Sequence, residues 1–258
     1  MQIVTWNVNS IKARMPHLLQ LTEQERPDVI LLQEIKTTYD NFPHGAVEEL
    51  GYNLAVCGQK SYNGVAILAK SRIEDIRFEL PGAKPEEARY IEGVVSIGAV
   101  TARVASIYVP QGTEVGSDRF FYKLEYYNYL NEHFHNLAKY SEIFVAGGDY
   151  NVAVEEIDVY SPKQLAGQLG FHIDERIRMR SILNGVMHDS YRAVAPDIQQ
   201  FSWWDYRSNG WKYNKGMRID YILLSSEGLD KLESAGVYEH YRGLERASDH
   251  VPVYCKLR

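Results

Sequence analysis

The chain has 258 residues, of which 45% are hydrophobic and 24% charged, and its 28 basic and 34 acidic residues give a formal charge of −6. This composition excludes an intrinsically disordered chain, a collagen-like repeat and a small disulfide-stabilised scaffold. The length allows one large domain or two small ones, and a core of that size needs no covalent cross-links. We therefore expect buried free thiols at Cys57 and Cys255, while a disulfide between them stays open.

The N-terminal residues MQIVTWNVNS lack the basic segment and long apolar stretch of a signal peptide. Apolar runs such as Val29–Leu32 are far shorter than the roughly 20 residues that a membrane helix needs. We therefore expect a soluble, cytoplasmic protein. The acidic balance argues against a protein that coats nucleic acid by bulk charge. It does not exclude a nuclease, because catalytic carboxylates add to the negative total.

Short apolar segments, often β-branched, recur along the chain and predict buried strands. The expected strands are Gln2–Trp6, Val29–Gln33, Asn53–Cys57, Gly64–Ala69, Ile91–Ile97, Ala102–Val109, Ile143–Gly147, Arg218–Leu224 and Val251–Leu257. No linker or repeat divides the chain. We therefore expect one α/β domain over residues 1–258, a four-layer sandwich of two facing mixed sheets flanked by helices.

Three helical patterns lie between these strands. The first is expected after a cap at Ser10, is interrupted or restarted at Pro16, and ends before Pro27. A long second helix is expected from about Arg119 to Lys139 with Asp118 as its cap, because its apolar residues repeat at about 3.6 positions. The third is expected over Ile173–Leu183.

Polar residues stand directly after several predicted strands, where a rigid strand end can hold a head group toward a cleft. Asn7, Glu34, Asp149 and Asn151 follow strands, Tyr108 stands at the end of one, and Asp249 and His250 directly precede the strand Val251–Leu257. Several also have ordinary interpretations, since Asn7 and Asp149 suit turns and Glu34 could pair with Lys36.

Asp220 differs from these residues because it lies inside an apolar run. A carboxylate buried there needs a hydrogen-bonding or cationic partner. His250 is the natural candidate, because a carboxylate on one ring nitrogen fixes the tautomer and raises the basicity of the other nitrogen. A purely structural Asp–His contact would leave the same pattern.

Together these residues predict one chemistry. The oxygen ligands, which are Glu34, Asp149, Asp249 and the amide of Asn7, suit Mg²⁺ or Mn²⁺ rather than zinc. The base would be Asp149 or the His250–Asp220 pair, with the Tyr108 phenol and the Asn151 amide as donors. The prediction is metal-assisted attack of water on a phosphodiester.

Sequence motifs strengthen this interpretation. They are WNVN (residues 6–9), LQEIK (32–36), YNGVAI (62–67), YVPQG (108–112), GDYNVA (148–153), EEID (155–158), WWDYR (203–207), RIDY (218–221) and SDHVP (248–252). In this order the motifs resemble those of the exonuclease III family of abasic-site endonucleases, within the endonuclease/exonuclease/phosphatase superfamily. The resemblance covers essentially the whole chain and implies a deoxyribonuclease I-like fold.

The resemblance implies a role for each matched position. Asn7 and Glu34 would bind the metal, with Asp249 close by. Asp149 would orient or deprotonate the attacking water, and Asn151 would stabilise the transition state. The remaining roles fall to Tyr108, at the scissile phosphate or leaving group, and to His250, held by Asp220 at the phosphate. In some members' models Asp149, Asn151 and His250 hold a second metal.

The family's abasic pocket matches Trp203 on one wall and Met217 on a second. Some relatives, including the animal enzymes, carry Trp at the latter position, so Met217 favours the bacterial exodeoxyribonuclease III branch. Contacts to the DNA backbone would position the duplex without reading its sequence. The candidates for these contacts are Lys60, Asn63, Arg89, Arg119, Lys123, Arg207 and Lys215.

The function implied is a DNA repair phosphodiesterase that depends on Mg²⁺ or Mn²⁺. It would cut 5′ to abasic sites in double-stranded DNA, degrade 3′ ends as a 3′–5′ exonuclease and remove 3′ phosphates, acting as a monomer and without a membrane. One alternative is a superfamily phosphatase or phospholipase acting on inositol phosphate or sphingolipid, against which the WWDYR and YVPQG segments argue. The other is a catalytically silent DNA-binding relative.

Overall fold

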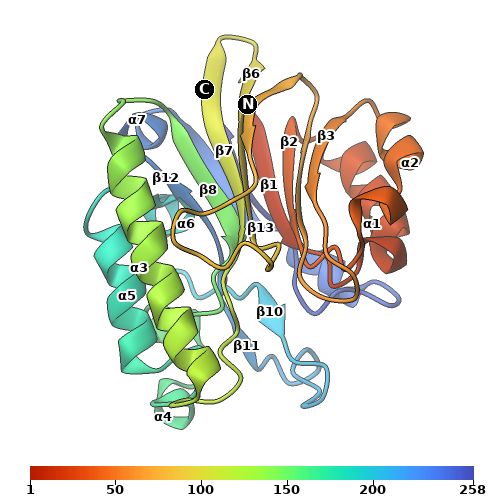
Figure 1. Cartoon of the computed structure of the whole chain (residues 1–258). Helices are drawn as coiled ribbons and strands as arrows, with labels where there is room; N and C mark the ends of the chain where they lie inside the picture. Colours follow the sequence, from red (N-terminus) through yellow and green to blue (C-terminus); the bar gives the residue numbers. More distant parts are fainter.

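Two six-stranded sheets pack face to face in the computed structural model, which describes residues 1–258 (Figure 1). The first sheet has the order β13-β14-β1-β2-β4-β3 and the second has the order β5-β6-β7-β8-β12-β9. The strands of the first are β1 (Gln2–Asn7), β2 (Val29–Gln33), β3 (Asn53–Cys57), β4 (Val65–Ala69), β13 (Leu232–Val237) and β14 (Val253–Leu257). Those of the second are β5 (Ile73–Arg77), β6 (Tyr90–Ile97), β7 (Val100–Tyr108), β8 (Phe144–Asp149), β9 (His188–Asp189) and β12 (Asp220–Leu224). Both sheets are mixed, because β1–β2 and β7–β8 are parallel and the other pairs are antiparallel.

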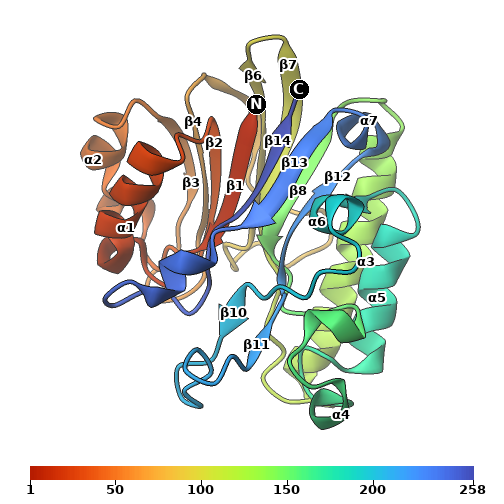
Figure 2. The same ribbon diagram turned by 180° about the vertical axis from the view of Figure 1, so that it is seen from behind.

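Helices cover the outer face of each sheet (Figures 1 and 2). Helices α1 (Ile11–Gln24) and α2 (His44–Glu48) pack on the first sheet, and α3 (Asp118–Ala138) and α5 (Ile173–Leu183) pack on the second. This layering follows from the alternation of side chains along each strand. In β1, Ile3 faces the core between the sheets while Val4 faces the core under α1. The four-layer α/β sandwich predicted from the sequence is confirmed.

Shorter elements complete the chain. They are the 3₁₀ turns η1 (Tyr39–Asn41), η2 (Glu156–Asp158) and η3 (Glu239–Gly243), the helices α4 (Pro162–Leu165), α6 (Ser190–Val194) and α7 (Ser226–Leu229), and the small ribbon of β10 (Trp203–Trp204) and β11 (Gly216–Met217). Both cysteines are free thiols, as expected. None of the helices combines the length and apolarity that crossing a membrane would require.

The predicted helices occur with small differences. The first, α1, runs unbroken through Pro16, so the predicted interruption there is wrong; the proline only leaves one carbonyl of the preceding turn without its amide donor. Ser10 forms no side-chain cap on α1. The cap of α3 is Ser117 rather than Asp118, because the Ser117 hydroxyl accepts the Phe120 amide at 3.2 Å.

Strand register brings the predicted polar residues to one edge of the sandwich. Asn7 ends β1 beside β2, and Glu34 follows β2 directly. Tyr108 and Asp149 end the parallel strands β7 and β8 opposite each other, and Asp149 also pairs with Asp220 at the start of β12. Residues that lie far apart in the sequence therefore meet at the ends of the central strands of both sheets.

Candidate active site

A cavity of about 680 Å³ opens at this edge of the sandwich. Its lining includes nine of the predicted site residues, which are Glu34, Tyr108, Asp149, Asn151, Trp203, Arg207, Met217, Asp249 and His250. The remaining lining comes from Asn9, Gln111, Leu169, Gly170, Asp205, Tyr206 and Ile219. Asn7 and Asp220 lie behind the cavity wall, where both are fully buried.

The amide of Asn7 joins two carboxylates of the site. Its Nδ2 donates to Oε1 of Glu34 at 2.8 Å and to Oδ2 of Asp149 at 2.9 Å. Asn7 therefore holds two groups that would otherwise repel each other. Burial raises the pKa of Asp149, and the nearby Asp220 and Glu34 add to this effect, although His250 and Asn7 oppose it. Asp149 is thus a carboxylate whose charge the protein only partly compensates.

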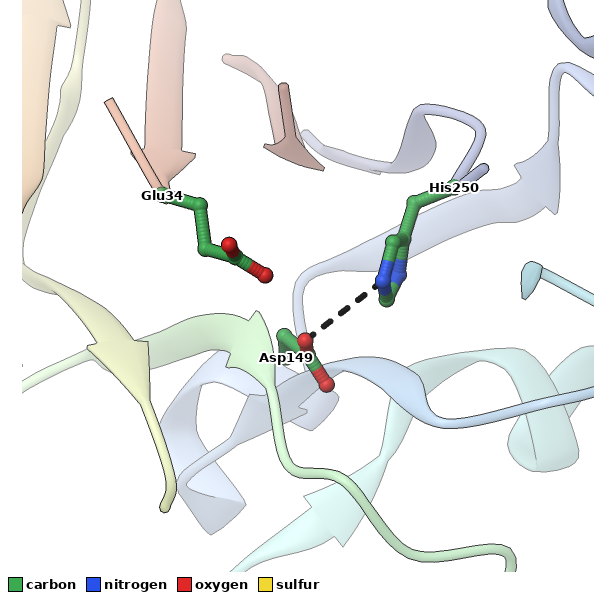
Figure 3. A group of neighbouring side chains, drawn as sticks. All are labelled: Glu34, Asp149 and His250. Carbon is green, nitrogen blue, oxygen red and sulfur yellow. Dashed lines mark ion pairs between the residues drawn. The ribbon is translucent and has the colours of Figure 1, made fainter. Parts of the chain in front are cut away.

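His250 lies between two aspartates. Its Nδ1 donates to Oδ2 of Asp220 at 2.9 Å, and its Nε2 lies 3.6 Å from Oδ2 of Asp149 (Figure 3). Asp220 is held in turn by the hydroxyl of Ser202 at 2.6 Å. Burial lowers the pKa of His250, but the charges of Asp220 and Asp149 outweigh burial, so the pKa is raised. The predicted Asp220–His250 contact is present, and it favours a charged imidazolium that points Nε2 into the site.

Asp249 occupies a separate position in the cavity. Its Oδ1 accepts the side-chain amide of Asn9 at 2.9 Å, and its Oδ2 accepts the Trp203 indole at 3.1 Å. Burial raises the pKa of Asp249, but His250 and the two hydrogen bonds outweigh burial and lower it. Both oxygens of this carboxylate are thus already engaged, and it anchors the Trp203 wall.

The donor set fits a hard divalent cation. One ligand atom each from Glu34, Asp149 and His250 lie within 4.8 Å of one another, and their side chains converge in Figure 3. Carboxylate oxygens are the ligands that Mg²⁺ and Mn²⁺ prefer, and a cation would offset the charge that raises the pKa of Asp149. Lys36 lies beside this group, with its Nζ 2.8 Å from Oε2 of Glu34. Asn7 offers the cluster its NH₂ group and so orients the two carboxylates, while its role as a metal ligand stays a prediction.

Tyr108 faces the carboxylates from β7. Burial and the charges of Glu34 and Asp149 raise the pKa of its phenol, which keeps the proton on the oxygen. The guanidinium of Arg89 lies 4.8 Å from the centre of the Tyr108 ring, and its Nε donates to Glu87 at 2.5 Å. Arg89 is only 6% exposed, so it supports Tyr108 from behind.

Asn151 enters the cavity from the turn after β8. Its backbone is in the left-handed region at φ 52°, which asparagine tolerates better than most residues. Its amide N–H donates to Oδ1 of Asp149 at 2.9 Å, and its side-chain Nδ2 donates to the carbonyl of Val109 at 2.9 Å. The turn is therefore tied both to the carboxylate and to the loop after β7.

Residues 4–250 match the model of the Endonuclease/Exonuclease/phosphatase family. The chain belongs to this family. It is 30% identical to exodeoxyribonuclease III of Haemophilus influenzae, with 100% of both chains covered. Among solved structures, a 3′ phosphatase (NExo) from Neisseria bound to a product DNA hairpin superposes with a TM-score of 0.93 at 33% identity, covering 100% of this chain and 99% of that one. An AP endonuclease from Archaeoglobus fulgidus gives a TM-score of 0.93 at 30% identity with the same coverage.

The apolar wall of the cavity is formed by the β10–β11 ribbon and by the loop before α5. Trp203 and Met217, predicted on two separate walls, are paired across the β10–β11 ribbon and both line the cavity. Leu169 and Gly170 complete it from the loop before α5, next to Met217. Neither residue was predicted from the sequence, because they follow no predicted strand and carry no polar side chain.

Of the residues predicted as DNA contacts, only one lies in the cavity lining. Arg207 lines the cavity, whereas Lys60 and Asn63 lie on the β3–β4 loop outside its lining. Lys60 and Lys215 are exposed, and Arg119 is paired with Glu87 at 2.7 Å. The prediction for Lys123 is wrong, because that side chain is completely buried against Glu175.

Proposed function

We propose that this protein is a divalent-metal-dependent DNA repair nuclease that cuts 5′ to abasic sites, degrades 3′ ends and removes 3′ phosphates. The observation that carries the proposal is the row Asp220–His250–Asp149, with Glu34 beside it, at the floor of a cavity with an apolar wall. The full-length similarity to an exodeoxyribonuclease III, a 3′ phosphatase and an AP endonuclease supports it. We further propose that it acts as a monomer on double-stranded DNA.

In this mechanism Asp149 accepts a proton from the attacking water. Its Oδ1 is held by the Asn151 amide and its Oδ2 by Asn7, so the carboxylate cannot rotate away from the cavity. Burial raises its pKa, which suits a general base because the optimum lies near the working pH. Its neighbour His250, charged and fixed by Asp220, donates from Nε2 to a phosphate oxygen.

The other donors face the charge that develops on the phosphate. Tyr108 keeps its phenolic proton and can donate it in a hydrogen bond, and Asn151 lies next to Asp149 in the same cavity. Such preorganised donors are the largest contribution in many hydrolytic enzymes. A divalent cation, Mg²⁺ or Mn²⁺, held at the carboxylates of Glu34 and Asp149, would supply a Lewis acid that polarises the phosphate.

The apolar wall suggests how damaged sites are selected. Trp203, Met217 and Leu169 present no hydrogen-bonding groups to a base, except for the indole N–H that Asp249 already accepts. A sugar without its base costs less to unstack and turn out of the duplex than an intact nucleotide. We propose that this wall receives the deoxyribose of an abasic site or of a 3′ end.

A substrate comparison tests the proposal. The purified protein would be incubated with a duplex that holds one abasic-site analogue, a duplex with recessed 3′ ends, a duplex with a 3′ phosphate, and inositol phosphate, each with Mg²⁺ and with EDTA. We expect turnover of the three DNA substrates with Mg²⁺ and none with EDTA. Turnover of inositol phosphate alone would refute the proposal in favour of a phosphatase, and binding of DNA without any cleavage would favour a silent relative.

A further inference from the structure

A buried ion pair joins the two helices on the outer face of the second sheet. Lys123 belongs to α3 and Glu175 to α5, which lie side by side in Figures 1 and 2. Neither side chain has any exposed area, and the ammonium contacts Oε1 of Glu175 directly. No step of the proposed mechanism uses either group.

Each remaining proton of the Lys123 ammonium goes to a backbone carbonyl. Nζ donates to the carbonyl of Asn151 at 2.7 Å and to that of Gln111 at 3.0 Å. An ammonium has three donors, so these two bonds and the bond to Glu175 satisfy it completely. Lys123 thus connects the turn after β8 to the loop after β7.

Glu175 uses its second oxygen in the same way. Its Oε2 accepts the backbone N–H of Gly170 at 2.8 Å and that of His172 at 3.0 Å. The loop before α5 is therefore attached to the same ion pair. A further bond closes the arrangement, because Ala153 donates its N–H to the carbonyl of Gly170 at 2.8 Å.

Three of the four backbone partners line the cavity, namely Gln111, Asn151 and Gly170. We infer that the Lys123–Glu175 pair is a positioning device that sets the catalytic turn and the apolar wall at fixed places around the substrate. This inference rests on the proposed function for the role of Asn151. Charge-assisted bonds of this kind are short and strongly directional, which suits them to fixing loops that have no regular structure of their own.

A purely structural ion pair would contribute to stability but would not affect kcat. Removing one partner of a buried pair destabilises a protein strongly because it leaves a charge uncompensated, whereas replacing both partners leaves no unpaired charge. The variant K123M/E175Q therefore separates the two roles. Met keeps the volume of the lysine stem, and Gln keeps a carbonyl that accepts the Gly170 and His172 amides. The bonds to Gln111 and Asn151 are lost.

The first test compares wild type, K123M/E175Q and R103M. R103M is the matched control, because Arg103 pairs with the fully buried Glu92 on the second sheet away from the cavity. We expect K123M/E175Q to lose some stability but stay folded at the assay temperature, while kcat on an abasic duplex falls about 10- to 100-fold, with KM changed less than about threefold. R103M should lose stability and keep kcat. An unchanged kcat in a folded K123M/E175Q protein would overturn the inference.

A second test asks whether the effect passes through Asn151. The four proteins are wild type, K123M/E175Q, N151A and the triple variant, because the coupling between sites is measured by such a cycle. We expect the K123M/E175Q change to reduce kcat less than about threefold once Asn151 is alanine. An equal reduction in both backgrounds would contradict the positioning role.

A measurement without turnover keeps this inference separate from the proposed function. The side-chain amide of Asn151 donates to Val109, so its NMR signal reports the position of the turn. We expect this signal to shift in K123M/E175Q and to stay in place in R103M. Absence of DNA cleavage by the wild-type protein would refute the proposed function, while an unmoved Asn151 signal in K123M/E175Q would refute the positioning role.

Discussion

Two buried charged clusters lie close together in this molecule, and their electrostatics are opposite. In the first, Asp149 is surrounded by Glu34 and Asp220, and its pKa is raised by burial and by these acidic neighbours although His250 and the Asn7 amide oppose them. In the second, Asp158 accepts the guanidinium groups of Arg218 and Arg192. Burial raises the pKa of Asp158, but these two arginines outweigh burial and lower it.

The difference distinguishes a cluster that can bind a ligand from a cluster that only stabilises the fold. A cluster whose charges are fully paired inside the protein has nothing left to offer a ligand, whereas an under-compensated one can bind a cation or a proton. The two clusters are also connected through the chain, because Met217, Arg218 and Asp220 stand almost next to one another. Arg218 also pairs with Asp189 at 2.7 Å, so the segment that carries Met217 and Asp220 is anchored by the paired cluster.

The largest expected effect comes from removing the under-compensated charge. Asp149→Asn should lower kcat for abasic incision by about 10²- to 10⁴-fold, because the proposed general base is lost. The fold should remain, since burial already disfavours the charge that is removed. Rates on an abasic duplex and thermal unfolding measure both effects. Cleavage at the wild-type rate would remove Asp149 from the mechanism.

The same substitution in the paired cluster should do the reverse. Asp158→Asn leaves the Arg218 guanidinium buried and short of a counter-charge, which should lower the free energy of unfolding by about 3 kcal/mol. The kcat of the folded protein should fall far less than in Asp149→Asn, because Arg218 keeps its pair with Asp189 and still anchors the segment that carries Asp220. Urea unfolding and rates at low temperature test this prediction.

The control for Asp158→Asn is Glu233→Gln, which breaks the exposed pair with Lys256 and should cost less than about 1 kcal/mol. Equal losses of stability in the two variants would show that the buried cluster contributes no more to stability than an exposed ion pair does.

The contribution of Asp158 should also depend on pH in a defined direction. Its pKa is lowered from 3.8 in the folded protein, so the stability it contributes is present above the unfolded pKa and is lost as the pH falls toward the folded pKa. The difference in unfolding free energy between wild type and Asp158→Asn should be constant from about pH 5 to pH 7 and shrink below about pH 4. Urea titrations across this range measure it. A difference that grows on acidification would have the wrong sign.

The strand framework was predictable because buried strands are dense in apolar, β-branched residues. Strands β5 and β13 were missed for the same reason, since IEDIR and LESAGV are polar segments at sheet edges. The Asp220–His250 contact was predictable because a carboxylate inside an apolar run needs a partner. The burial of Lys123 was not, because lysines are normally exposed and its partner Glu175 is 52 residues away.

The smallest expected effect comes from changing Met217 in the apolar wall of the cavity. Met217 is 6% exposed, and its methyl group lies next to Gly170, so a larger side chain there must extend into the cavity. Met217→Trp should therefore exclude nucleotides that keep their base more strongly than sugars that lack one. The ratio of abasic incision to 3′ exonuclease activity should rise by about 3- to 10-fold, within the range that one apolar change produces in a pocket.

Met217→Leu is the matched control, because a swap that conserves volume is tolerated in packed surroundings and should leave that ratio within about twofold of wild type. The paired cluster also limits how the wall can respond to the substitution. Arg218 fixes the backbone next to Met217 through Asp158 and Asp189, so the wall cannot yield to the larger side chain by moving away. If the ratio does not change in Met217→Trp, the segment has moved, and the anchoring role assigned to the paired cluster is wrong together with the role of Met217 in the pocket.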